Sequence, residues 1–284
     1  MQIITEPCQM QAIAEKLRLN RQLISVVMTM GALHEGHLSL VKLARQSSGT
    51  VILTIFVNPS QFGVGEDLHQ YPRPFDQDIA LAKAAGVDYL FAPEAKSVYP
   101  ENHQTTIDCG ALGKRLEGER RPGHFNGMAT IVTKLFHITK PHRAIFGEKD
   151  AQQLAIIRQL VKDLDLDITV VAAPIVREEN GLAVSSRNIY LSSQERSAAA
   201  ILYQGICHAE TCIAGKKTNL PAIAAEIERM ISATPGCRPD YVAFVDEERF
   251  LPAETTEEGK EYRLLLAAWC GAVRLIDNCK IRAC

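Results

Sequence analysis

The chain has 284 residues, of which 46% are hydrophobic and 23% are charged, and 31 basic and 33 acidic residues leave a formal net charge of −2. This length favours two domains and a substantial core. The well-mixed charges create no field that would draw a nucleic acid or an anionic membrane, so we expect small-molecule partners, with no nucleic acid and no membrane among them.

The chain has no apolar run of the roughly 20 residues that a membrane helix requires. Its first residues, MQIITEPCQM, lack the basic start and the apolar core of a leader, so we expect a cytoplasmic protein. Eight scattered cysteines without a Cys-x-x-Cys pair are typical of small buried apolar residues. A metal on Cys207 and Cys212 is an alternative, but two further ligands at a usable spacing are not evident, so we expect no metal ligand set.

Strand-like and helix-like patterns alternate as far as Pro174. The β-branched run from Leu23 to Met28 predicts a strand buried on both faces, and the apolar spacing from His37 to Arg45 predicts a helix. Further strands are expected at 50–57, 87–92, 143–147 and 167–174, and further helices at 78–86, 128–138 and 152–164. This order predicts an α/β fold with a doubly wound parallel sheet and helices on both faces.

The pattern changes after Pro174. We expect one long helix at 192–214, a second helix at 221–231, and strands at 241–246, 262–270 and 272–278. Only Gly271 separates the last two strands, which predicts a tight antiparallel pair. The predicted domains are therefore residues 1–175 and a smaller α+β domain of residues 176–284.

The first candidate site follows the first predicted strand, because ligands bind outside the carboxyl ends of parallel strands. The stretch GALHEGHLSL places His34 and His37 around Gly36 where a helix begins. A helix N-terminus and two imidazoles can donate hydrogen bonds to phosphate oxygens, and Gly36 would leave space for a base or ribose. A cap and a surface histidine are the ordinary alternative. A metal on His34, Glu35 and His37 is a weaker one, because the spacing does not match a zinc helix.

Two more loops after strands carry polar groups. In FVNPSQFG, the Gln61 amide offers both donors and an acceptor to a small substrate, whereas Asn58 fits an ordinary Asn-Pro turn. In FGEKDAQQL, Asp150 and Gln153 fit a capping box, which leaves Lys149 as a cation just ahead of a helix and well suited to a polyphosphate.

A fourth segment, GLAVSSRN, joins Ser185 and Ser186 to Arg187. A simple polar turn explains the two serines equally well. Together with Lys149, however, Arg187 would supply a second cation for a phosphate chain, on a loop that we expect to move.

Seven motifs in order resemble the pantothenate synthetase family, also called pantoate:β-alanine ligases. They are MTMGALHEGH, FVNPSQFG, YPR, RPGHFNGM, FGEKDAQQL, VRE and SSRN, and RLIDN continues the match. The His-x-Gly-His signature alone is shared by a wider nucleotidyltransferase superfamily that includes class I aminoacyl-tRNA synthetases. The resemblance implies a Rossmann-like N-terminal domain that binds nucleotide and pantoate, a smaller C-terminal domain that closes over ATP, and a homodimer.

The resemblance also implies an activity and a set of site residues. The family joins D-pantoate to β-alanine with ATP and Mg²⁺, and releases pantothenate, AMP and pyrophosphate through a pantoyl adenylate. The implied nucleotide-binding residues are Met30, Gly31, Ala32, Leu33, His34, Glu35, Gly36, His37, Gly147, Glu148, Lys149, Asp150, Val176, Val184, Ser185, Ser186 and Arg187.

Catalytic roles are expected for four of these residues, namely His37 as proton donor, His34, Lys149 and Arg187. The resemblance implies that Gln61 and Gln153 hold pantoate and that Gln61 lies near β-alanine. Asn58, Arg121 and His124 are further candidates for contact with substrate. Two other functions stay open on the residues alone: another adenylyl- or cytidylyltransferase, and a nucleotide-binding regulatory module without turnover.

Overall fold

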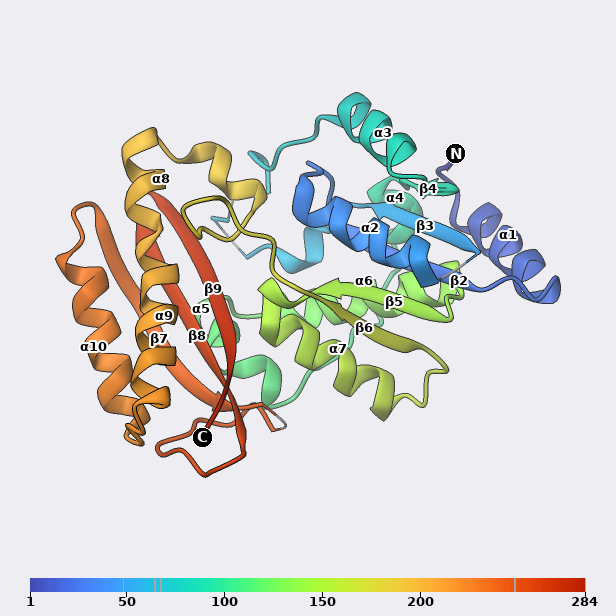
Figure 1. Cartoon of the computed structure of the whole chain (residues 1–284). Helices are drawn as coiled ribbons and strands as arrows, with labels where there is room; N and C mark the ends of the chain where they lie inside the picture. The colour runs from blue at the N-terminus through green and yellow to red at the C-terminus, as the bar shows by residue number, and fades with distance from the viewer. Residues whose placement is uncertain (48, 64, 67, 248, 284) are drawn as a thin grey trace. The chain divides into compact units, whose positions relative to one another are not determined.

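The structure is a computed structural model that describes residues 1–47, 49–63, 65–66, 68–247 and 249–283 (Figure 1). It divides into two compact units. The first comprises Met1–Glu148 and Gln152–Pro174, and the second comprises Lys149–Ala151 and Ile175–Cys284. Within the described ranges, every helix is too short or too polar to cross a lipid bilayer.

The first unit contains a six-stranded sheet in the order β1-β4-β3-β2-β5-β6. Its strands are β1 (Gln2–Ile4), β2 (Ile24–Thr29), β3 (Thr50–Ile55), β4 (Tyr89–Phe91), β5 (Arg143–Gly147) and β6 (Thr169–Ala173). All neighbouring strands pair in parallel, which confirms the predicted parallel sheet.

Helices cover both faces of this sheet. The helices before the second unit are α1 (Pro7–Leu19), α2 (Glu35–Ser47), α3 (Phe75–Ala84), α4 (Ala95–Val98), α5 (Glu117–Arg120), α6 (His124–Thr139) and α7 (Ala151–Asp163), with 3₁₀ turns η1 (Pro59–Gln61), η2 (Leu112–Lys114) and η3 (Glu148–Asp150). Side chains of β2 alternate between two apolar clusters. Val26 packs in the cluster that contains α1, α6 and α7, and Val27 packs in the cluster that contains α2 and α3. Burial on both faces explains the continuous apolar run in the sequence.

The second unit packs helices against a three-stranded antiparallel sheet. The helices are α8 (Ser193–Ala199), α9 (Ile201–Ala214) and α10 (Leu220–Ala233), after the 3₁₀ turn η4 (Ser186–Tyr190), and the strands are β7 (Cys237–Asp246), β8 (Glu261–Cys270) and β9 (Val273–Arg282). The order β7-β8-β9 confirms the predicted antiparallel pair around Gly271, whose φ of 58° suits glycine in a tight turn.

Several expected elements differ in the structure. The expected helix at 192–214 is two helices, because the Ala200 N–H bonds to the Ser197 carbonyl in a tight turn that interrupts the regular ladder. Helix α3 begins at Phe75 and not at Asp78, directly after Pro74. We predicted neither β1, which is only three residues long, nor α1, although Pro7 at the start of α1 is a typical helix-start signal.

Candidate functional site

The loop after β2 is held in shape by a residue from a distant helix. Gly31 has φ 84° and Ala32 has φ 50°, so two successive residues adopt left-handed backbone. The carboxylate of Asp78 on α3 accepts hydrogen bonds from the backbone N–H groups of Ala32 (2.9 Å) and Leu33 (2.7 Å). A Cβ at Gly31 would lie 3.0 Å from Asp78 Oδ2, so only glycine lets the carboxylate approach this closely.

Asp78 is 1% exposed, and burial raises the pKa of its carboxyl even though the two N–H donors favour the charged form. Sequence reasoning did not identify Asp78 as part of the site. Two signals were available: an acidic residue in the first turn of a helix, and a glycine-containing loop that needs an acceptor for its N–H groups.

His34 and His37 lie together at the start of α2. His34 directly precedes the helix, and its carbonyl accepts a hydrogen bond from the Leu38 N–H (3.0 Å), while His37 is the third helical residue. The two imidazole rings stack with centroids 4.0 Å apart and planes inclined by 24°. Both residues are half-buried, and the Nδ1 atom of each ring is itself buried. Glu35, between them in the sequence, is exposed.

The space beside Gly36 is taken up by the His34 ring. A Cβ at Gly36 would lie 2.9 Å from His34 Cε1 and 3.0 Å from its Nδ1. The glycine therefore admits the His34 ring in this structure, and contact between Gly36 and a base or ribose stays a prediction. The same absence of a side chain permits the two rings to stack.

The amide of Gln61 is held by two neighbours. Its Oε1 accepts a hydrogen bond from Asn58 Nδ2 (3.0 Å), and its Nε2 donates to the Met30 sulfur (3.0 Å). Asn58 is 1% exposed and also donates to the Gly127 carbonyl (3.1 Å), while its Oδ1 accepts from the hydroxyls of Ser60 and Tyr99 (2.9 Å each). Because both amide protons and the oxygen of Asn58 are engaged, its role in the structure is to orient Gln61.

Arg121 and His124 form a chain that ends at Gln61. His124 Nδ1 lies 2.8 Å from the Gln61 carbonyl oxygen, and its Nε2 lies 3.1 Å from Arg121 Nη1. The Arg121 guanidinium makes a bidentate ion pair with Glu66, with distances of 2.8 and 2.6 Å. Arg121 thus already has an acidic partner within the first unit, and contact between its guanidinium and substrate stays a prediction.

A cavity of about 390 Å³ opens beside the loop after β2. Met30 and Gly31 line it from this loop, and Arg73 and Asp78 supply charged groups on the α3 side. The volume is within the range of sites for small ligands, and most of the other lining residues are apolar.

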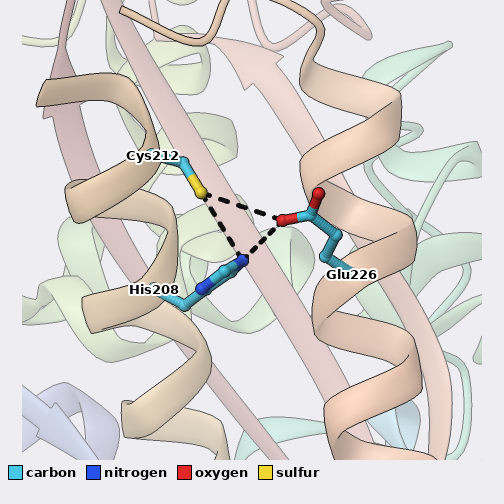
Figure 2. A group of neighbouring side chains, drawn as sticks. All are labelled: His208, Cys212 and Glu226. Carbon is cyan, nitrogen blue, oxygen red and sulfur yellow. Dashed lines mark hydrogen bonds and ion pairs between the residues drawn. The ribbon is translucent and has the colours of Figure 1, made fainter. Parts of the chain in front are cut away.

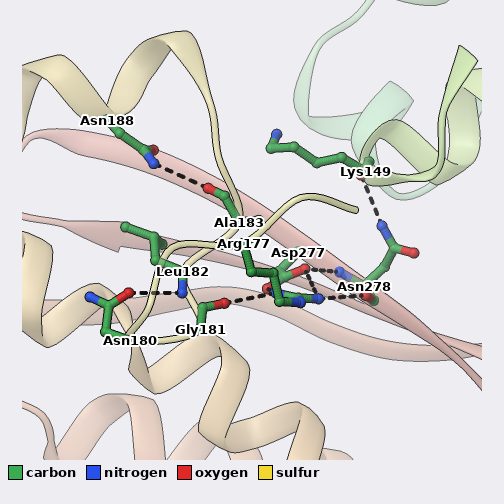
Figure 3. Close-up of polar contacts among 9 residues, drawn as sticks. All are labelled: Lys149, Arg177, Asn180, Gly181, Leu182, Ala183, Asn188, Asp277 and Asn278. Carbon is green, nitrogen blue, oxygen red and sulfur yellow. Dashed lines mark hydrogen bonds and ion pairs between the residues drawn. The ribbon is translucent and has the colours of Figure 1, made fainter. Parts of the chain in front are cut away.

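In the second unit, the Lys149 backbone is tied to β9 (Figure 3). The amide Nδ2 of Asn278 donates to the Lys149 carbonyl at 2.8 Å, and its Oδ1 accepts from Arg263 Nη1 at 2.6 Å. Asn278 is 1% exposed. The motif RLIDN contributes to the family resemblance, but the sequence assigns Asn278 no role. Its contact with Lys149 joins residues 129 positions apart, so no local pattern reveals it.

The segment 176–188 is fixed by a buried ion pair and a short hairpin. Arg177 makes a bidentate pair with Asp277 (2.6 and 3.0 Å), donates to the Gly181 carbonyl (3.0 Å), and lies 4.6 Å from the centre of the Tyr203 ring. Burial lowers the pKa of Arg177, but the hydrogen bonds and charge of Asp277 outweigh burial, so the net shift is upward. Figure 3 shows Arg177 lying between the hairpin and β9.

The predicted serine and arginine residues follow this hairpin. Val184 donates its N–H to the Val176 carbonyl at 2.9 Å, and the Ser185 hydroxyl accepts from the Arg187 N–H at 3.3 Å. Asn188 closes the turn by donating to Glu178 (2.9 Å) and to the Ala183 carbonyl (3.1 Å). Ser186 and Arg187 begin η4.

The remaining expected site residues lie near the start of α7. Gly147 ends β5, Glu148 to Asp150 form η3, and Gln153 is half-buried on α7. The neighbouring Gln152 has a structural role, since its amide donates to the carbonyls of Leu112 and Arg115 (2.8 and 2.9 Å).

Comparison with known proteins shows matches along the whole chain. A family model described as pantoate-beta-alanine ligase matches residues 2–280. A pantothenate synthetase from Pelodictyon phaeoclathratiforme is 81% identical over 283 residues, covering 100% of both chains. A pantothenate synthetase from Chlorobium limicola is 68% identical over 278 residues, covering 98% of each chain.

Solved structures are similar to this chain as well. The crystal structure of pantothenate synthetase from Thermus thermophilus has a TM-score of 0.92 and 41% identity, and covers 99% of this chain and 100% of that one. The pantoate-beta-alanine ligase from Francisella tularensis, complexed with beta-gamma ATP and beta-alanine, has a TM-score of 0.81 and 36% identity, with 98% and 97% coverage.

Proposed function

The chain belongs to the pantoate-beta-alanine ligase family and is therefore a ligase that forms pantothenate, and we propose that it does so through a pantoyl adenylate, releasing AMP and pyrophosphate. ATP is the nucleotide substrate of this proposal, supported by the Francisella tularensis ligase, whose structure is described as a complex with beta-gamma ATP and beta-alanine.

The observation that carries the proposal is the stacked pair of His34 and His37 at the start of α2. The helix N-terminus and the two half-buried imidazoles lie together at the start of α2, and both kinds of group can donate hydrogen bonds to phosphate oxygens. Asp78 holds the preceding turn through two backbone hydrogen bonds, so these donors are positioned before a ligand arrives.

In the first step, a carboxylate oxygen of pantoate attacks the α-phosphorus of ATP. The new O–P bond forms as the bond to the β-phosphate bridging oxygen breaks, and pyrophosphate leaves with that electron pair. Charge builds on the equatorial oxygens and on pyrophosphate. His34 and His37 stabilise that charge by donating hydrogen bonds, and His37 is the proton donor of the proposal.

Lys149 and Arg187 supply positive charge to the phosphates in the same proposal, and the Ser185 and Ser186 hydroxyls supply donors. Support comes from how the second unit holds their backbones: Asn278 binds the Lys149 carbonyl, and the Arg187 N–H bonds to Ser185. The other nucleotide contacts of the proposal are Met30 to Leu33, Glu35, Gly36, Gly147, Glu148, Asp150, Val176 and Val184.

In the second step, the neutral amine of β-alanine attacks the adenylate carbonyl. A C–N bond forms, the C–O bond to AMP breaks, and the amine loses a proton. The rate gain of this step is largely positional. Gln61 and Gln153 would hold pantoate, and the two hydrogen bonds that orient the Gln61 amide support its part in this assignment.

Mg²⁺ is a further part of the proposal. It supplies charge neutralisation on the phosphates when bound. Among the residues that the structure describes, the cluster of ligand atoms close enough to hold a metal includes none of the proposed nucleotide contacts. Mg²⁺ usually reaches such sites mainly through substrate phosphates and water. On the family resemblance we also propose a homodimer and a cytoplasmic location.

The decisive experiment is pantoate-dependent exchange of labelled pyrophosphate into ATP, with Mg²⁺ present and β-alanine absent. Exchange above the level without pantoate would establish a reversible adenylate. If AMP forms only after β-alanine is added and no exchange occurs, the separate first step is refuted. A stable nucleotide product without AMP would support the nucleotidyltransferase alternative.

A further inference from the structure

Helices α9 and α10 bring together three metal-ligating side chains that the proposed ligase reaction does not use. They are His208 and Cys212 on α9 and Glu226 on α10 (Figure 2). Residues four apart share one face of a helix, which directs both α9 side chains toward α10. The sequence offered a metal on Cys207 and Cys212 only as an alternative to the expectation of no metal ligand set. In the structure Cys207 is exposed, and residues five apart point to different faces of a helix.

We propose that His208, Cys212 and Glu226 form a binding site for Zn²⁺ or a similar divalent transition-metal ion, with water as the fourth ligand. A thiolate, an imidazole and one carboxylate favour such ions over Mg²⁺ and Ca²⁺, which prefer sites built from oxygen. Binding replaces the thiol proton of Cys212 by a metal–sulfur bond and releases that proton to solvent.

The distances between the ligand atoms are close to those of a tetrahedral zinc site. Bond lengths of about 2.3 Å to sulfur and about 2.1 Å to nitrogen or oxygen place the sulfur about 3.6 Å from each of the other two ligand atoms. In the structure, Cys212 Sγ lies 3.5 Å from His208 Nε2 and 3.8 Å from Glu226 Oε2. The two distances from the sulfur therefore need little adjustment when a metal binds.

The distance between His208 Nε2 and Glu226 Oε2 must lengthen when the metal enters. His208 Nε2 and Glu226 Oε2 are hydrogen-bonded at 2.7 Å, whereas ligands of one tetrahedral ion would lie about 3.4 Å apart. Their side chains are 32% and 31% exposed, so both have room to move and the site is open to solvent. Cys212, at 6% exposed, forms its inner wall.

Lys217 occupies the outer side of the cluster and is the competing cation. Its Nζ lies 3.4 Å from Glu226 Oε2 and 3.5 Å from Oε1, and its side chain is 54% exposed. A lysine side chain is protonated at neutral pH, so this ammonium competes with a metal ion for the Glu226 carboxylate. A dication at the three ligands would displace this flexible side chain into water.

The helices that carry the ligands are held close by the core of the second unit. Ile206 and Ile213 of α9 and Ile223 and Ile227 of α10 belong to one apolar cluster. A Cβ at Gly205 would lie 2.8 Å from Ile227 Cγ2, so this glycine permits the close approach of the two helices. The ligands are thus nearly preorganised, and a bound ion would brace α9 against α10.

Titration of the full-length, metal-free protein with Co²⁺ tests the site. We expect one equivalent to give a thiolate-to-cobalt charge-transfer band, and Zn²⁺ to displace it and raise the melting temperature. Cys212→Ser should abolish the band, and His208→Ala and Glu226→Gln should weaken binding at least tenfold. Cys207→Ser is the matched control on the same helix and should bind as wild type.

The cobalt titration tests this site separately from His34 and His37 of the proposed ligase site. Absence of the band in a folded wild-type protein, or a band retained in Cys212→Ser, would overturn the proposal. Lys217→Ala provides an independent check, because removal of the competing ammonium should tighten Zn²⁺ binding by several-fold. Equal or weaker binding in that variant would contradict the arrangement described above.

Discussion

The carboxylate of Asp78 accepts a 2.7 Å hydrogen bond from the backbone N–H of Leu33, a residue 45 positions earlier in the chain. Asp78 also accepts a hydrogen bond from the Ala32 N–H, and the two bonds together determine the path of the loop that leads to His34 and His37. Asp78 is therefore a positioning residue for the proposed nucleotide site.

Asp78→Ala should lower both stability and adenylation. It leaves two loop N–H groups without their acceptor, at a cost of about 1–3 kcal/mol for each group that stays buried. Asp78→Asn should be milder, since its single amide oxygen still accepts one bond. Urea unfolding and pyrophosphate exchange measure the two effects, with exposed Asp76→Asn as control. Wild-type exchange in a folded Asp78→Ala protein would contradict the positioning role.

His37→Ala and Lys149→Ala should each reduce adenylation about tenfold to a hundredfold, because a hydrogen bond to a charged group contributes about 1.5–3 kcal/mol. The measurement is the rate of pantoate-dependent pyrophosphate exchange at saturating ATP. The exposed residues His137 and Lys162 provide matched alanine controls. Unchanged rates would remove the assigned roles, whereas a collapsed melting curve would indicate a structural role.

Gln61→Ala and Asn58→Ala should affect different quantities. Gln61→Ala should raise the KM for pantoate more than the KM for ATP, with a modest change in melting temperature. Asn58→Ala removes an amide that makes four hydrogen bonds, so it should lower stability as well as pantoate use. Steady-state kinetics and thermal melts separate them. A pantoate KM that stays unchanged in Gln61→Ala would count against substrate contact.

His142 should make stability depend on pH near neutrality. Its neutral Nδ1 accepts the Ile24 N–H at 3.1 Å, and burial, followed by the charge of Arg18, lowers the pKa of His142 below its ordinary value of 6.5. A lowered histidine pKa means that the stabilising contribution is fully present above pH 6.5 and is lost as the pH falls through the folded-state pKa.

The comparison with His142→Asn isolates this contribution. The difference in free energy of unfolding between wild type and His142→Asn should shrink as the pH falls from 7.5 to 5. Denaturant unfolding at several pH values measures it, and exposed His137→Asn serves as the control. A difference that stays constant or grows toward acid would show that His142 is not held neutral in the fold.

Local patterns in the sequence predicted much of the first unit. The β-branched run after Leu23 became β2, and the strand-to-helix transition placed His37 in the first turn of α2. These features depend on backbone preferences and on which side chains are apolar, and both are visible within a window of about ten residues. The break at Ala200 was not visible, because apolar and helix-favouring residues continue through it.

The sequence itself determined the alternation of strands and helices, the switch to an antiparallel unit and the positions of the loops that carry polar residues. Only the tertiary structure decided which distant groups meet: Asp78 with Leu33, Asn278 with Lys149, and Glu226 with His208. The physical reason is that strand order and helix packing result from burial summed over the whole chain, whereas a hydrogen bond requires two atoms to meet within a few tenths of an ångström.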